Sequence, residues 1–158
     1  MEKTKNVFIS HYGKDNDKIE DLRNLLSKQG YSLRDSSISS QDNNATSENY
    51  IKEQLLKPKI NWAGQMIVLI GKQTHKRDFV NWEIEQAHKE GKPILGIYVH
   101  GGKTEDYKLP ENFERYGSAL TGWDTNNIVK ALEGDFHDFT NPENISRPSS
   151  TFFKRGDC

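Results

Sequence analysis

The chain has 158 residues, which is enough for one domain with a sizeable core. Its 22 Lys and Arg residues nearly balance 23 Asp and Glu residues, which argues against a general nucleic-acid binder because such proteins usually show a basic excess. No apolar run approaches the roughly 20 residues of a membrane-spanning helix, the one cysteine (Cys158) allows no intrachain disulfide, and no secretory signal is visible, so we expect a cytoplasmic protein.

The first 35 residues predict a strand, a helix and a second strand. The apolar run 7–9 ends at Ser10 and predicts a strand. The helical pattern that follows can be capped by Asp15 or Asp17 and stops at Gly30. Tyr31 to Arg34 then predicts a second, short strand.

Two polar stretches and a short helix are predicted around the middle of the chain. Residues 35–47 are rich in Ser, Asn and Asp and predict a long loop, of the kind often kept for function. Residues 48–57 predict a short amphipathic helix that Pro58 ends. Residues 106–115 are polar with one proline and predict a loop.

The strongest signals lie between Met66 and Val99. Apolar runs at 66–71 and 93–99 suit parallel strands buried on both faces, and a helix from Phe79 to about Glu90 separates them. Residues 118–123 predict a fifth strand, and a last helix begins after Asp124 and closes at Gly134.

This alternation predicts an α/β fold with a doubly wound, five-stranded parallel sheet of flavodoxin-like type and strand order 2-1-3-4-5. We expect one domain over residues 1–134. The segment 135–158 is a C-terminal tail whose role the sequence leaves open, either packing against the domain or capping an interface.

Polar side chains follow the predicted strands, and ligands in open α/β sheets bind outside the carboxyl ends of the strands. We therefore expect one cleft there, including the loop out to Ser40. The candidate substrate-binding residues are Ser10, His11, Tyr12, Asp35, Ser36, Ser37, Thr74 and Trp82.

Glu83 is the candidate catalytic residue. At helical spacing it shares a face with Val80 and Ala87, so its carboxylate should point partly inward, whereas Glu85 should face solvent. A carboxylate there can stabilise the positive charge that develops on a ribose when a glycosidic bond breaks. The alternative is a structural ion pair, for example with Arg77.

Several other chemistries lack their motifs. The chain has no G-x-G-x-x-G and no G-x-x-x-x-G-K-[ST], so ordinary dinucleotide and P-loop phosphate cradles are absent. Its five histidines are scattered without metal-ligand spacing, and no metal site is expected. No G-x-S-x-G nucleophile elbow occurs.

Several segments together resemble a TIR domain, and more closely the TIR-like proteins of the bacterial Thoeris anti-phage systems. These segments are Val7 to Tyr12, Val68 to Thr74, Arg77 to Ala87, Gly91 to Ile97 and Leu120 to Trp123. The loop after the second strand departs from the usual TIR pattern, since it lacks the Gly and Pro that commonly shape it.

The resemblance implies cleavage of NAD+ at the nicotinamide–ribose bond, followed by cyclisation to an ADP-ribose-type signal for a separate effector. NAD+ would be the substrate, with no further cofactor, and Glu83 matches the catalytic glutamate of the family. Implied partners are other TIR-like subunits and a phage component as trigger, with neither nucleic acid nor membrane involved. The alternatives are a non-catalytic TIR-like adaptor and an enzyme resembling nucleoside deoxyribosyltransferases.

Overall fold

The computed structural model describes residues 3–35, 51–99, 107–140 and 146–148. A seven-stranded sheet runs through the molecule in the order β2-β1-β3-β4-β5-β6-β7. Its strands are β1 (Lys3–Ser10), β2 (Tyr31–Asp35), β3 (Gln65–Ile70), β4 (Ile94–Tyr98), β5 (Ala119–Thr121), β6 (Asp138–Thr140) and β7 (Ser146–Pro148). The first five strands are parallel in the order 2-1-3-4-5, which confirms the predicted fold.

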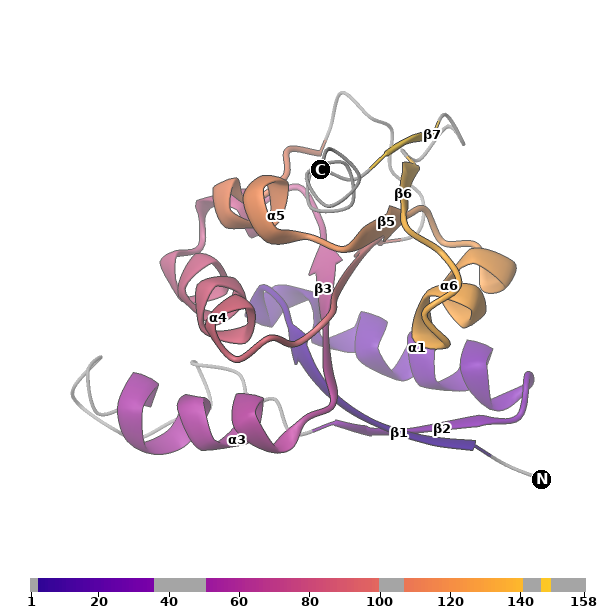
Figure 1. Cartoon of the computed structure of the whole chain (residues 1–158), viewed down its shortest axis with the longest axis horizontal. Coiled ribbons are helices and arrows are strands. Elements are labelled where there is room, and N and C mark those ends of the chain that lie inside the picture. The colour runs from indigo at the N-terminus through magenta and orange to yellow at the C-terminus, as the bar shows by residue number, and fades with distance from the viewer. Residues whose placement is uncertain (1–2, 36–50, 100–106, 141–145, 149–158) are drawn as a thin grey trace.

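Helices cover both faces of the sheet (Figure 1). The longer helices are α1 (Asn16–Ser27), α3 (Lys57–Trp62), α4 (Asp78–Lys89), α5 (Glu111–Tyr116) and α6 (Thr125–Leu132). Helices α3, α4 and α5 lie on one side of the sheet, and α1 and α6 lie on the other. Short turns of other helical types occur at η1 (Gly13–Asp15), η3 (Ile51–Leu56) and η4 (Thr74–Lys76).

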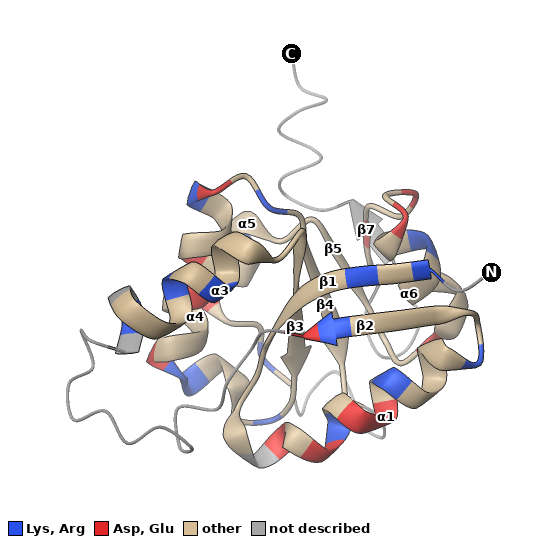
Figure 2. Cartoon of the chain, turned by 90° about the horizontal axis from the view of Figure 1, so that it is seen from below, with Lys and Arg blue, Asp and Glu red and all other residues tan. Residues whose placement is uncertain are grey.

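The core is built from the two runs that the sequence singles out. Residues Met66 to Ile70 are almost fully buried, as are Ile94 and Ile97 on the neighbouring strand. Strands buried on both faces are typical of a sheet flanked by two helical layers. Charged side chains remain on the outside, for example the acidic residues along α1 (Figure 2).

The sheet is wider than the five strands expected. Strand β6 pairs in parallel with β5, and β7 pairs antiparallel with β6. Both are three-residue strands in a segment of mixed charge, so no apolar run marks them. Phe139 on β6 is 2% exposed and its ring stacks on that of Phe113, with centroids 5.5 Å apart.

Two local expectations were wrong. Pro58 does not end a helix: η3 continues directly into α3, and Pro58 lies in the first turn of α3. The segment 106–115 is not all loop, because α5 begins after Pro110 and buries Phe113 completely. A six-residue helix with one buried side chain gives too short a pattern to show periodicity.

Candidate active site

A hydrogen bond between Ser10 and Glu83 lies at the carboxyl edge of the sheet. Ser10 is the last residue of β1, and Glu83 lies in the second turn of α4. Side chains alternate along a strand, so Ser10 faces the same side of the sheet as Phe8, the side that α4 covers. The Ser10 hydroxyl donates to Oε1 of Glu83 at 2.7 Å.

Glu83 points inward as its spacing predicts. It is 6% exposed and belongs to the buried stripe of α4 with Val80, Ile84 and Ala87. Burial raises the pKa of its carboxyl to about 8, the Ser10 hydrogen bond opposes that rise, and the negative charge of Asp35 adds to it. In the part of the chain that the structure describes, Glu83 has no ion-pair partner, and Arg77 does not pair with it.

Asp35 ends β2 and reaches across to β1. Its Oδ1 accepts a hydrogen bond of 3.1 Å from the backbone N–H of Ile9. The pairing of β1 with β2 ends at Val7 and Asp35. The Asp35 carboxylate therefore provides the acceptor for Ile9 N–H that a further residue of β2 would have provided. The hydrogen bond also holds the negative charge of Asp35 near Glu83, and this charge raises the pKa of Glu83.

His11 and Asp15 extend the same edge. The imidazole of His11 contacts the Ile9 carbonyl through Nδ1 at 2.8 Å and the Asn16 side chain through Nε2. Asp15 lies at the start of α1, but its side chain makes no capping hydrogen bond. Its carboxylate lies against Gly71, where a Cβ would be only 2.8 Å from Oδ2, and burial raises its pKa.

Tyr12 and Arg77 form a stacked pair beside these groups. The guanidinium carbon of Arg77 is 3.8 Å from the centroid of the Tyr12 ring. Arg77 is the residue just before α4, and the Tyr12 ring follows Ser10 by two residues. The pair therefore joins the loop after β1 to the helix that holds Glu83.

Thr74 and Trp82 have structural contacts of their own. The Thr74 hydroxyl is buried within the turn after β3, where it accepts from Gly71 N–H at 2.8 Å and lies 3.4 Å from the Leu69 carbonyl. Trp82 packs against the core, and the ammonium of Lys52 lies 5.7 Å from its ring centroid. A role in substrate binding stays a prediction for both residues.

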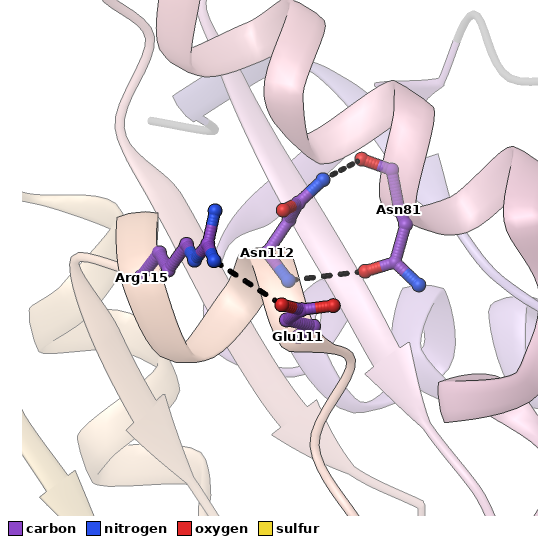
Figure 3. A network of polar contacts seen from close by, with 4 residues as sticks. All are labelled: Asn81, Glu111, Asn112 and Arg115. Atoms are coloured by element: carbon purple, nitrogen blue, oxygen red, sulfur yellow. Dashed lines mark hydrogen bonds and ion pairs between the residues drawn. The ribbon is translucent and has the colours of Figure 1, made fainter.

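Two hydrogen bonds between Asn81 and Asn112 join helix α4 to α5 (Figure 3). The side-chain amide of Asn112 donates to the backbone carbonyl of Asn81 at 2.7 Å, and Asn81 Oδ1 accepts from the backbone N–H of Asn112 at 3.0 Å. Asn81 is two residues from Glu83. This paired contact holds the turn of α4 that positions the carboxylate.

Other predictions concern residues beyond this cluster. Ser36, Ser37 and the rest of the loop to Ser47 lie outside the described residues. Across the described ranges, no three His, Cys, Asp or Glu gather to hold a metal ion, and no helix there is long and apolar enough to cross a membrane. A cavity of about 290 Å³ lies at the opposite, amino edge, lined by residues such as Ile94 and Ala119 at strand starts.

Sequence reasoning missed two groups at this edge. Asp15 was considered only as a helix cap, although Gly71 at the end of β3 is a signal that a side chain approaches closely there. For the Arg77 side chain the sequence suggests only an ion pair with Glu83. Its stacking on Tyr12 depends on the meeting of two loops and leaves no local signal.

The sheet order, the helices on both faces and the polar groups at its carboxyl edge define a doubly wound α/β domain of flavodoxin-like type. The family model described as Thoeris protein ThsB, TIR-like domain, matches residues 8–104, and the chain belongs to this family. No curated protein matches it in sequence. Among solved structures, that of the CMP N-glycosidase BcmB from Clostridium botulinum aligns with 18% identity over 82% of this chain and 98% of that chain, with a TM-score of 0.46.

Proposed function

We propose that the chain is an enzyme of bacterial anti-phage defence that breaks the nicotinamide–ribose bond of NAD+ and forms a cyclic ADP-ribose-type nucleotide. That nucleotide would activate a separate effector protein. The observation that supports this most is the buried Ser10–Glu83 pair at the carboxyl edge of the sheet, in a chain that belongs to the Thoeris ThsB TIR-like family.

Glu83 would act by electrostatics. Nicotinamide is bound as a cation and leaves as a neutral ring with the electron pair of the broken bond, so no general acid is needed. The ribose is left with positive charge, which a carboxylate held next to it stabilises. Water can capture this cation and release a proton to solvent to give ADP-ribose, or a nucleophile of the same nucleotide can capture it to close a ring.

The raised pKa of Glu83 fits a site for a cationic substrate. Before binding, burial favours the protonated carboxyl. A pyridinium ring placed beside it favours the carboxylate instead, because an opposite charge nearby stabilises the ionised form. Substrate binding and ionisation of Glu83 are therefore coupled in this proposal, and Ser10 stabilises the ionised form that the chemistry needs.

The test is incubation of the full chain with NAD+, with and without lysate of phage-infected cells, followed by mass spectrometry of the nucleotides. We expect the isolated chain to be weakly active, because sites of this resemblance are usually completed by a neighbouring subunit, and we expect lysate to stimulate it. Release of nicotinamide together with a cyclic product supports the proposal. Absence of both under both conditions favours a non-catalytic adaptor, and base exchange on deoxynucleosides favours a deoxyribosyltransferase.

A further inference from the structure

Arg77 is a cation at the candidate active site that the mechanism above does not use. Its guanidinium is stacked on Tyr12, and across the described ranges it forms no ion pair. Its Nε atom is buried and has no hydrogen-bond partner there. Asp78, the next residue, is exposed and does not pair with it.

The stacking leaves the guanidinium ready to bind an anion. A guanidinium is planar, with five N–H donors that radiate within the plane. The cation–π contact with the Tyr12 ring is not a hydrogen bond, so it does not use up these donors. Such a preorganised fork matches the oxygens of phosphate groups, which it can bind through two parallel hydrogen bonds.

Charged groups of both signs lie along the carboxyl edge of the sheet. The Asp35 and Glu83 carboxyl groups contact Ile9 and Ser10 of β1, and the Asp15 carboxylate lies against Gly71 after β3. Arg77 lies at the end of the loop after β3, immediately before α4, and contacts Tyr12. A dinucleotide with a cationic ring at one end and a diphosphate farther along would meet a carboxylate at Glu83 and a guanidinium at Arg77.

Arg77 and Glu83 are held by the same helix. Arg77 immediately precedes α4, and Glu83 lies in its second turn. Neighbouring turns of one helix therefore carry the group that would hold the ribose and begin beside the group that would hold the phosphates.

We propose that Arg77, held against the Tyr12 ring, binds the diphosphate of the dinucleotide and so selects phosphorylated substrates over the free nucleoside. This inference rests on the proposed function and names the group that recognises the phosphates. It makes Arg77 a binding residue, distinct from Glu83, which acts on the reacting bond.

The experiment measures binding by the full chain with isothermal titration calorimetry, using ADP-ribose and nicotinamide riboside as probes. Arg77→Gln should weaken ADP-ribose binding by about ten- to a hundredfold, the usual range for losing charged hydrogen bonds. Nicotinamide riboside, which has no phosphate, should bind wild type and variant within about twofold. The matched control is Lys76→Gln, which removes the adjacent exposed charge and should change either affinity by less than about threefold.

A second variant covers the case in which Arg77→Gln does not fold. Arg77→Lys keeps the charge but loses the planar fork, and it should still bind ADP-ribose several-fold more weakly than wild type. Four results would overturn the inference. Arg77→Gln could weaken the binding of both probes equally, or Arg77→Gln and Lys76→Gln could weaken ADP-ribose binding equally. Arg77→Lys could bind ADP-ribose as tightly as wild type, or wild type could fail to bind ADP-ribose. If ADP-ribose binding depends on Arg77 but no nicotinamide is released from NAD+, the inference is upheld and the proposed function is rejected. If nicotinamide is released at the same rate by wild type and Arg77→Gln, the proposed function is upheld and the inference is rejected.

Discussion

The hydroxyl of Ser10 donates a 2.7 Å hydrogen bond to the carboxyl of Glu83, across 73 positions of the sequence. Both side chains are buried, at 1% and 6% exposure. Among the described residues, Ser10 is thus the hydrogen-bond partner of this buried carboxyl group. This relationship ties the end of β1 to the second turn of α4.

Ser10→Ala should raise the pKa of Glu83 further, because the lost hydrogen bond is the contact that lowers it. The free energy of unfolding should fall by about 1 kcal/mol. Carboxyl-carbon NMR titration of wild type and variant measures the first effect. Ser118→Ala is the control: its hydroxyl accepts from Ile94 N–H at 3.0 Å far from Glu83, so it should lose stability without moving this titration. An unchanged Glu83 midpoint in Ser10→Ala would contradict the assignment.

The stability of the protein should depend on the ionisation of Glu83. In the unfolded chain this carboxyl has its ordinary pKa of 4.5, and in the fold its pKa is about 8. Between these values the folded state holds a proton that the unfolded state has released, so the contribution of Glu83 to stability falls as pH rises and levels off above about 8. The slope is at most about 1.4 kcal/mol per pH unit.

Urea unfolding at several pH values tests this expectation by comparing wild type with Glu83→Gln. The variant cannot ionise at this position, so its stability should gain on wild type as pH rises from about 5 to 8. Other titrating groups are common to both proteins and cancel in the difference. A difference that stays constant over this range would mean that Glu83 titrates normally.

Thr74→Val should destabilise the fold by about 1–3 kcal/mol, because it leaves the buried N–H of Gly71 without its acceptor. Thr74→Ser keeps the hydroxyl and should retain most of the stability. Urea unfolding measures both. If Thr74→Val is as stable as wild type but raises KM for NAD+, the hydroxyl serves the substrate rather than the turn.

Asn112→Ala should lower the free energy of unfolding by about 0.5–1.5 kcal/mol through loss of the bond to the Asn81 carbonyl. Arg115→Ala, on the same short helix, removes only an exposed pair with Glu111 and should cost less than about 0.5 kcal/mol. Thermal or urea unfolding distinguishes the two. Equal losses would show that the Asn81–Asn112 contact does not clamp α4.

Long apolar runs made the fold predictable from sequence. The apolar runs 66–70 and 94–98 are separated by a clear helical pattern, as two parallel strands with a crossover helix require. Repetition of this arrangement along the chain predicts a doubly wound sheet, and the observed order of the first five strands agrees with it. Strands β6 and β7 could not be predicted, because three-residue strands in a polar segment depend on the sheet edge that receives them. The inward direction of the Glu83 side chain could be predicted from its helical spacing to Val80 and Ala87.

The finer contacts of the site could not be read in the same way. The bonds from Ser10 to Glu83 and from Ile9 to Asp35 join segments that are distant in the sequence. The first depends on how α4 packs on β1, and the second depends on the register of β1 and β2. For the same reason the sequence suggests an ion pair of Arg77 with Glu83, six positions farther along the chain, whereas the loop after β1 brings Tyr12 against Arg77.

The most direct test of the central claim is the rate of nicotinamide release from NAD+ by wild type, Glu83→Gln and Glu85→Gln, under the condition in which wild type is most active. Glu83→Gln keeps the shape of the side chain and removes its charge, so we expect a loss of roughly 10²–10³ in rate with the fold intact. The Glu85 side chain is 46% exposed and lies 3.8 Å from Lys89, so Glu85→Gln should stay near the wild-type rate. Equal rates for wild type and Glu83→Gln, with both proteins folded, would contradict a catalytic role for Glu83.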